Sequence, residues 1–329
     1  MTSPSTRLHI VTGKGGTGKT TVAASLAMSL AKNGRKVLLC EVEGRQGIAR
    51  LFDVAPLPYE ERQIAVGHGG GQVFALAIDP EAALLEYLQM YYKLGRAGRA
   101  LDKFGIIDFA TTIAPGVRDV LLTGKVFEAA KRRDKQGDYV YDALVLDAPP
   151  TGRITRFLNV NAEVAGLAKV GPIRKQADSI MMMMRAKRTS VHLVTVLEEM
   201  PVQETLDCIT ELRSADLPVG HVIVNQVRPS ALDTKTQEAI SSGSLGAKVV
   251  ARSMRKVSLA VPDEDVTDLA AALAAEGRAH VERLTLQADQ RKVLTELDNP
   301  VSELVFLSDG IDVGALYELA TALESQGLS

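Results

Sequence analysis

Residues 9–21 read HIVTGKGGTGKTT, and they carry the strongest structural signal in this 329-residue chain. The apolar, β-branched beginning predicts a short buried strand, and the glycines that follow predict a tight loop. From residue 20 onward, apolar residues recur at helical spacing as far as Asn33-Gly34, a pair typical of the end of a helix. Strand, glycine-rich loop and helix, in that order, are the surroundings in which a phosphate-binding loop occurs.

The loop itself matches the pattern Gly-x-x-x-x-Gly-Lys-Thr from Gly13 to Thr20. Backbone amides in such a loop point inward at phosphate oxygens, and the N-terminus of the following helix adds partial positive charge. We expect Lys19 to reach the β- and γ-phosphates and Thr20 to ligate Mg²⁺. The alternative is a glycine-rich turn between strand and helix that binds no ligand.

Two further apolar runs, residues 35–44 and about 139–146, predict parallel strands that are buried on both faces. The second run ends in Asp147, and the carboxyl end of a parallel strand is where a second magnesium contact, through water, is expected. A solvated carboxylate at a strand end is the alternative. Further strands are predicted at 71–79, 190–198, 217–226 and 303–310. The predicted fold class is α/β, a doubly wound, mostly parallel sheet of the P-loop NTPase type with a helical subdomain.

Composition and charge exclude several classes of protein. The formal net charge is −2, so nucleic acid is not an expected partner. No apolar run approaches the roughly 20 residues that cross a bilayer, and the first residues, MTSPSTR, lack an apolar signal segment. The two cysteines, Cys40 and Cys208, lie far apart, and with five scattered histidines they suggest neither a disulfide framework nor a metal cluster. We therefore expect a cytoplasmic protein.

A second lysine, Lys14, directly follows the first glycine of the loop, although phosphate binding requires only one. With this lysine the loop resembles the deviant Walker A loop of a class that includes the arsenite-pump ATPase, the tail-anchored-protein-targeting ATPase, nitrogenase iron protein and the partition ATPases. In that class the extra lysine reaches the nucleotide of a partner subunit. The resemblance therefore implies a dimer in which Lys14 acts in trans, much as an arginine finger does.

Two later stretches narrow the resemblance. Residues 147–152 read DAPPTG and resemble the switch II segment of the arsenite-pump and tail-anchor-targeting ATPases, Asp-Thr-Ala-Pro-Thr-Gly, with departures at Ala148 and Pro149. Asn225, near the end of a predicted strand, is similar to the asparagine that reads adenine in that family, and its amide suits the adenine edge. A turn residue at a strand end is the alternative for Asn225. The resemblance looks closest to the actinobacterial anion-transporting ATPase branch, whose members often occur as paired paralogous subunits.

Switch I departs from the family pattern. Where the family usually has Asp-Pro-Ala-His, residues 43–46 read EGRQ, so Glu43 keeps a carboxylate while the proline and histidine are gone. An attacking water is sensitive to displacements of about 1 Å, so we expect slow hydrolysis in isolation or dependence on a partner. The family's zinc-binding cysteine pair and its arsenite-binding cysteine triad are also missing. We therefore expect neither zinc nor arsenite to bind.

Residues 79–135 and 153–188 are predicted to be helical insertions that form a subdomain within a single P-loop ATPase domain spanning 1–329. In the resembling family such helices lie over the nucleotide and can build an apolar client groove. Met181 to Met184 cover all faces of a helix, so at least one methionine should be exposed. Methionine suits an adaptable client surface, but the simpler interpretation is that these residues belong to the subdomain core. Residues 232–298 are predicted to be largely helical, with a break at Pro262.

The predicted function is that of a dimeric switch ATPase that binds and hydrolyses Mg·ATP and couples nucleotide state to movement of the subdomain. The alternative is a non-hydrolysing, nucleotide-binding regulatory subunit of a heteromeric ATPase. Expected partners are a second copy or a paralogous ATPase subunit, and a protein client or membrane protein. The predicted catalytic residues are Lys14, Lys19, Glu43 and Asp147, and the predicted magnesium ligands are Thr20 and Asp147. The predicted nucleotide-binding residues are Gly13, Gly15, Gly16, Thr17, Gly18, Lys19, Thr20, Thr21, Gly152 and Asn225.

Overall fold

The computed structural model describes residues 6–92, 115–160, 172–257, 262 and 264–328. Predictions for 93–114 and 161–171 lie outside these residues. The chain divides into two compact units. The first comprises Met1–Val196, Met200–Gln226 and Asp298–Ser329, and the second comprises Leu197–Glu199 and Val227–Leu297.

The first unit is built on a sheet in which the described residues form eight strands, in the order β3-β4-β2-β5-β1-β6-β7-β8. The pairs β1–β5, β1–β6, β2–β4, β2–β5 and β6–β7 are parallel, and β3–β4 is antiparallel. The mostly parallel, doubly wound sheet predicted from the sequence is thereby confirmed. The strand bounds are β1 (Leu8–Gly13), β2 (Lys36–Glu41), β3 (Arg62–Val66), β4 (Gln72–Ala77), β5 (Ala143–Asp147), β6 (Thr189–Thr195), β7 (Val219–Val227) and β8 (Val301–Val305).

Strand β3 was not predicted, because most of its residues are exposed and its apolar residues are confined to the short stretch 64–66. It pairs with β4 through a turn in which the Gly67 amide donates to the Gly71 carbonyl at 2.8 Å. A side chain at Gly71 would place its Cβ 1.5 Å from the carbonyl oxygen of Ala31, so this close approach requires glycine. Strand β5 begins later than predicted, because Tyr139 instead forms an isolated antiparallel bridge with Arg133.

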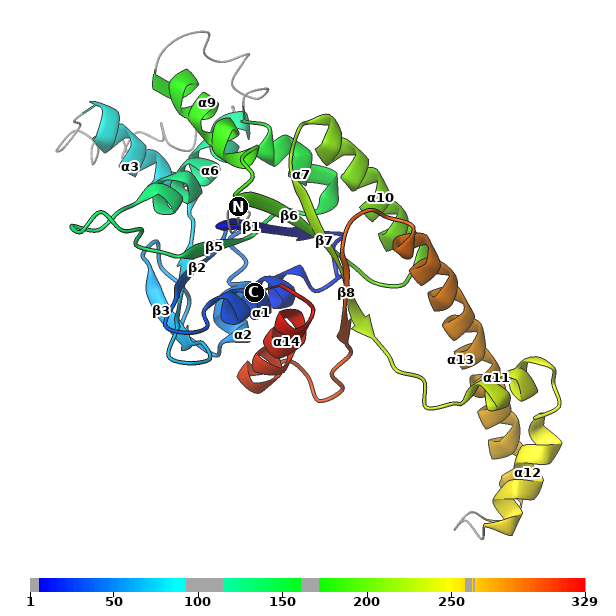
Figure 1. Ribbon diagram of the computed structural model, residues 1–329. Coiled ribbons are helices and arrows are strands. Elements are labelled where there is room, and N and C mark those ends of the chain that lie inside the picture. Colours follow the sequence, from blue (N-terminus) through cyan, green and yellow to red (C-terminus); the bar gives the residue numbers. More distant parts are fainter. Residues whose placement is uncertain (1–5, 93–114, 161–171, 258–261, 263, 329) are drawn as a thin grey trace. The chain divides into compact units, whose positions relative to one another are not determined.

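Helices cover both faces of the sheet. Figure 1 shows α1 (Lys19–Leu30) and α14 (Val313–Ser325) side by side on one face, with α6 (Pro115–Lys131), α7 (Thr151–Leu158) and α9 (Pro172–Met184) on the other. Helix α1 is buried from Val22 to Leu30 and shares one apolar core with β2, β4 and α14. This burial holds the start of α1, and therefore the loop before it, in a fixed position. The other helices among the described residues of this unit are α2 (Gly47–Leu51), α3 (Pro80–Tyr92) and α10 (Glu199–Ser214).

The predicted helical insertions correspond to α3, α6, α7 and α9 in the described residues. Helix α6 begins at Pro115, at the predicted break, since proline is well suited to the first turn of a helix. Met181 and Met184 are buried whereas Met182 is 75% exposed, which confirms that one methionine of the run faces solvent.

The second unit is helical and comprises α11 (Thr234–Ser241), α12 (Ala247–Lys256) and α13 (Val266–Thr295). Its core consists of Ala251 and Met254 from α12 packed on Val266 and Ala270 from α13. The predicted helices and the break at Pro262 are confirmed, whereas the separation of this segment as a compact unit was not predicted. Within the described part of the chain, every helix is too short or too polar to cross a lipid bilayer.

Candidate nucleotide site

The parallel register brings three strand ends to one edge of the sheet. Val11 of β1 pairs with Asp147 of β5, and Asp147 in turn pairs with Glu41 of β2. Gly13, the last residue of β1, pairs with Val194 of β6. Strand β1 thus lies between β5 and β6, and the order of strands reverses beside it: the chain runs from β1 to β2 toward one edge of the sheet and from β6 to β7 toward the other. Ligands of open α/β sheets bind at the carboxyl ends of strands beside such a switch point.

The loop from Lys14 to Gly18 leaves this edge and requires glycine where it approaches its neighbours. A Cβ at Gly13 would lie 2.1 Å from the carbonyl oxygen of Val194. Gly18 has a φ of 85°, and a Cβ there would lie 2.3 Å from Nδ2 of Asn225. At Gly15, by contrast, a Cβ would meet nothing within 4 Å. The loop is therefore packed against strands on one side and open on the other, as a cradle for phosphate would be.

Lys19 and Thr20 open helix α1 and lie beside Asp147. The Thr20 hydroxyl donates to Asp147 Oδ2 at 2.7 Å, and the Lys19 ammonium donates to the Lys14 carbonyl oxygen at 3.4 Å. Burial raises the pKa of Asp147 to about 6, while the Thr20 hydrogen bond and the Lys19 charge act in the opposite direction. Burial likewise lowers the pKa of Lys19, against the opposing effect of Asp147 and Glu43.

The oxygens of Thr20 and Asp147 fit a magnesium ion. Mg²⁺ prefers hard oxygen ligands and usually takes one or two protein groups together with waters and substrate phosphates. Among the described residues, no group of three or more His, Cys, Asp or Glu side chains could hold a metal without such additional ligands. The hydroxyl of Thr20 and the buried carboxylate of Asp147 are therefore the protein groups that would hold the ion. When bound, it would supply positive charge to the β- and γ-phosphate oxygens.

The segment after β2 brings Glu43 to the same edge. Its Oε2 lies 3.7 Å from Nε of Arg45, and both residues line a cavity of about 200 Å³. The backbone is fixed just beyond them. Gln46 adopts a φ of 54°, accepts a hydrogen bond from the Leu57 amide and donates one to the Leu57 carbonyl. The other residues that line the cavity are Val42, Arg118, Leu122, Pro149, Arg153 and Phe157.

Lys14 makes a contact that sequence reasoning did not find. Its ammonium lies 2.8 Å from Glu204 Oε1 of helix α10, and Glu204 Oε2 accepts a hydrogen bond from the Thr151 hydroxyl at 3.0 Å. The Lys14 hydrogen bond lowers the pKa of Glu204. Glu204 therefore connects the loop to the first residue of α7, the helix that follows Asp147. No local pattern marks Glu204, because it lies 53 residues beyond Thr151 on an ordinary amphipathic helix.

Of the remaining predicted residues, Thr17 and Thr21 lie in or next to the loop, Asn225 contacts it, and Gly152 lies in α7. Asn225 is 7% exposed, and its side-chain amide donates to the Thr17 carbonyl at 2.9 Å. Thr17 is buried, and Thr21 lies partly buried in the first turn of α1. Gly152 is the second residue of α7, and a Cβ there would meet nothing within 4 Å. The fold thus brings Asn225 against the loop, while contact of these residues with a nucleotide stays a prediction.

The sequence of this chain matches a known protein family. A model of the family described as "Anion-transporting ATPase" matches residues 6–187 and 172–243. This chain belongs to the anion-transporting ATPase family. The predicted family is therefore confirmed, and membership supports nucleotide binding and ATPase activity.

Individual proteins with similar sequences are also named as ATPases. "ATPase BagA" of Mycobacterium tuberculosis (strain ATCC 25618 / H37Rv) is 52% identical over 322 residues, covering 98% of this chain and 94% of the relative. "ATPase GET3" of Kluyveromyces lactis is 26% identical over 261 residues, covering 69% of this chain and 74% of the relative. "ATPase get3" of Schizosaccharomyces japonicus is 26% identical over 275 residues, covering 74% of this chain and 81% of the relative. These relatives all carry the name ATPase, which is what the match to the family model also implies.

Proposed function

We propose that this member of the anion-transporting ATPase family binds and hydrolyses Mg·ATP as a dimeric switch. The observation that carries the proposal is the 2.7 Å hydrogen bond from Thr20 to Asp147, with Lys19 beside it at the mouth of the glycine loop. A hydroxyl, a buried carboxylate and a lysine at one helix N-terminus are the groups that phosphoryl transfer requires for metal and phosphate binding.

Each group has a role in this proposal. The backbone amides of the loop hold the phosphates, and Lys19 neutralises charge on the β- and γ-phosphate oxygens. Thr20 would ligate the magnesium ion and Asp147 would hold it through water, so that the ion would neutralise charge on the phosphates. Glu43 orients the attacking water, and Asn225 reads the adenine edge.

The chain's own contacts suggest how nucleotide state is transmitted. The Thr12 hydroxyl donates to the Pro149 carbonyl at 2.7 Å, which couples β1 to the segment after Asp147. That segment leads directly into α7, where Thr151 contacts Glu204. A shift of Asp147 on nucleotide binding would therefore move α7 and change the Lys14–Glu204 ion pair. These changes would in turn displace the helices over the site.

A second candidate function is that of a non-hydrolysing, nucleotide-binding regulatory subunit. The observation that favours it is the ion pair between Glu43 and Arg45, which engages the carboxylate proposed to hold the water. Turnover of the purified chain, alone and with a paralogous subunit, separates the two functions. Nucleotide binding without turnover in the chain alone, together with turnover of the complex that is unchanged by Glu43→Ala in this chain, would support the regulatory role.

The Lys19→Ala variant tests the phosphate site. We expect its Mg·ATP affinity, measured by calorimetry, to fall by at least about a hundredfold, because a charge-assisted contact to phosphate is lost. Lys14→Ala is the matched control in the same loop. Because Lys14 serves a partner's nucleotide in this proposal, the affinity of its monomer should stay within about threefold of the original. Unchanged affinity in Lys19→Ala, with a native circular dichroism spectrum, would refute the phosphate site.

A further inference from the structure

Helix α12 carries a concentration of positive charge. Its ten residues, AKVVARSMRK, include Lys248, Arg252, Arg255 and Lys256 and no acidic residue. Ala251 and Met254 of this helix pack into the core against α13, so the basic side chains extend away from that core. The four basic residues are exposed. Such a one-signed surface is an electrostatic feature that favours an anionic partner.

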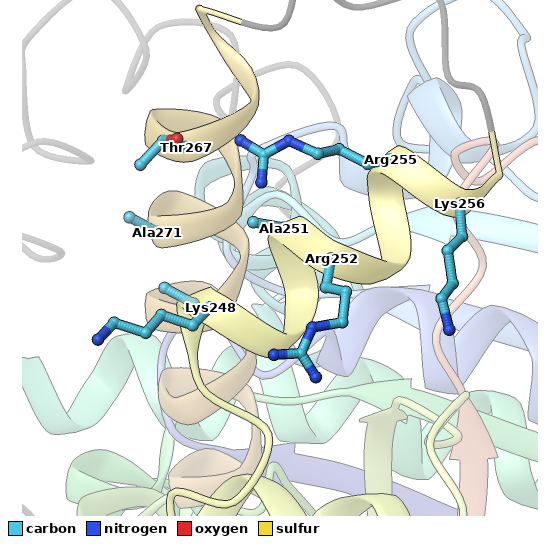
Figure 2. Close-up of a pocket in the computed structure, with 8 residues that line it drawn as sticks. Lys248, Ala251, Arg252, Arg255, Lys256, Thr267 and Ala271 are labelled. Atoms are coloured by element: carbon cyan, nitrogen blue, oxygen red, sulfur yellow. The ribbon is translucent and has the colours of Figure 1, made fainter.

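The basic side chains border a groove between α12 and α13. The groove has a volume of about 560 Å³ and is lined by Ala247, Lys248, Ala251, Arg252, Arg255, Lys256, Thr267 and Ala271. Figure 2 shows Ala251 pointing toward α13. Arg255 extends toward Thr267, and Lys248 extends at the other end of the groove, lower in this view than Ala271. Lys248 and Arg255 are seven residues apart, which separates them by about 10 Å along the helix. The groove thus has a floor of small side chains between two cationic ends.

We propose that this groove docks an acidic helical segment of a partner protein. The methyl groups of Ala251 and Ala271 let a third helix approach α12 and α13 closely, because interhelical distance depends on side-chain size at the contact. Carboxylates placed two turns apart on that helix would meet the cationic ends in charge-assisted hydrogen bonds. The proposal concerns only the Val227–Leu297 unit and does not depend on the ATPase function.

Other anionic partners fit the groove less well. A membrane surface or a nucleic-acid backbone would meet the cations, but it would leave the recessed alanine floor unfilled. The chain as a whole has a net charge of −2, which disfavours nucleic acid further. In a narrow segment, small apolar side chains would contact the alanine floor, and acidic side chains would contact the basic residues that border the groove.

Other charged residues of this unit affect which basic side chains can bind the acidic segment. Glu264 and Asp265 precede α13, and Asp268 lies in its first turn; none of the three lines the groove, but all belong to the same unit. Arg255 already has another interaction within the protein. Reversal of Lys248, at one end of the groove, together with the neighbouring Arg252 therefore tests recognition without disturbing the interaction that Arg255 already makes.

The electrostatic test uses the full-length protein and a fluorescein-labelled helical peptide with two glutamates seven residues apart and alanines between them. Fluorescence anisotropy measures binding at low salt. We expect Lys248→Glu/Arg252→Glu to weaken binding by at least about tenfold, because like charges then face each other. The control is Arg278→Glu/Arg283→Glu, an equal charge reversal at exposed positions of α13 outside the groove. An equal loss in both variants would overturn the proposal, because binding would then follow net charge alone.

A second pair of variants tests occupancy of the groove without changing charge. Ala271→Trp fills the floor and should abolish peptide binding, whereas Ala272→Trp, exposed on the neighbouring face of α13, should not. Binding that survives Ala271→Trp, or no measurable binding to the original protein, would overturn the proposal. Circular dichroism spectra of all variants verify the fold. Tighter binding to phosphatidylserine vesicles or to a single-stranded RNA than to the peptide would likewise overturn it.

Discussion

Lys14 lies in a contact that would have to break before it could reach a partner's nucleotide. Its ion pair with Glu204 is partly exposed, and such pairs contribute at most about 1 kcal/mol. The pair is therefore strong enough to hold the side chain in place and weak enough to exchange. We interpret it as the resting position of Lys14 in an isolated chain.

Glu204→Gln tests this interpretation. The variant keeps the size of the side chain, removes its charge and should release Lys14. We expect nucleotide-dependent dimer formation, measured by analytical ultracentrifugation, to strengthen by about two- to fivefold, the range that a surface ion pair can supply. Glu211→Gln is the matched control, because Glu211 lies two turns further along α10 and accepts a hydrogen bond from Thr155 of α7. Weaker dimers in Glu204→Gln alone would instead assign Glu204 a role in the closed state.

Glu43 is the residue on which the rate of hydrolysis should depend. We expect Glu43→Asp to match or exceed the original turnover, because aspartate restores the shorter carboxylate that the family usually has. Glu43→Ala should lower turnover by about ten- to a hundredfold if the carboxylate orients water. Phosphate-release assays measure both variants, and Glu60→Ala at an exposed position is the control. Robust turnover in Glu43→Ala would mean that another group holds the water.

Across the strands, three histidines form a chain of contacts in which His9 and His192 are buried and His221 is half-buried. Nε2 of His192 on β6 lies 3.1 Å from Nδ1 of His9 on β1, and Nδ1 of His192 accepts from the His221 amide on β7 at 3.2 Å. His192 must therefore be neutral with its proton on Nε2, where it donates to His9. Burial lowers the pKa of His9 to about 4 and that of His192 well below its ordinary value.

The histidine chain should make the free energy of unfolding depend on pH. The pKa of His9 is lower in the folded protein than in the unfolded chain, so protonation favours the unfolded chain. The contribution of neutral His9 to the free energy of unfolding is therefore complete above about pH 6.5 and is lost as the pH falls through about 4. The expected loss from His9 is about 3 kcal/mol in the free energy of unfolding at the acidic end of that window. Urea unfolding across the window measures it. His9→Gln should flatten the dependence relative to His68→Gln at an exposed position, and equal slopes would contradict the assignment.

At the level of the assembly, the proposed trans role of Lys14 would require a second nucleotide site, and therefore a dimer. Switch I is altered here, while the loop, Asp147 and the end of switch II are kept. A subunit can tolerate this asymmetry when its partner carries a stronger hydrolytic site. We therefore propose a heterodimer with a paralogous ATPase, with a homodimer forming when the chain is produced alone.

Co-expression with a paralogous ATPase tests this assembly. We expect a 1:1 complex by light scattering and an ATPase activity above the sum of the separate subunits, because each site would receive a cation from its partner. Separate homodimers with additive activities would refute the heterodimer. In that case, the unusual residue at position 43 would have to be explained within this chain alone.

The glycine-rich loop between β1 and α1 and the fold class were predictable because their signals are local. A phosphate loop requires glycines, a lysine and a threonine at fixed spacing between a strand and a helix, and residues 13–20 supply all of them. Apolar strands buried on both faces are equally visible in a run such as residues 36–41. Asp147 could be assigned to the site because the carboxyl ends of parallel strands meet at one edge.

What the sequence left open depends on contacts between distant segments. The Lys14–Glu204 pair, the histidine chain and the groove between α12 and α13 each join residues whose proximity is set by packing, not by spacing along the chain. Strand β3 was missed for a related reason, because an exposed edge strand with only three apolar residues, 64–66, gives a weak local signal and is held by its pairing with β4. Local chemistry thus predicts a nucleotide-binding loop from the sequence, whereas the partners of Lys14 and the surface of α12 follow only from the folded chain.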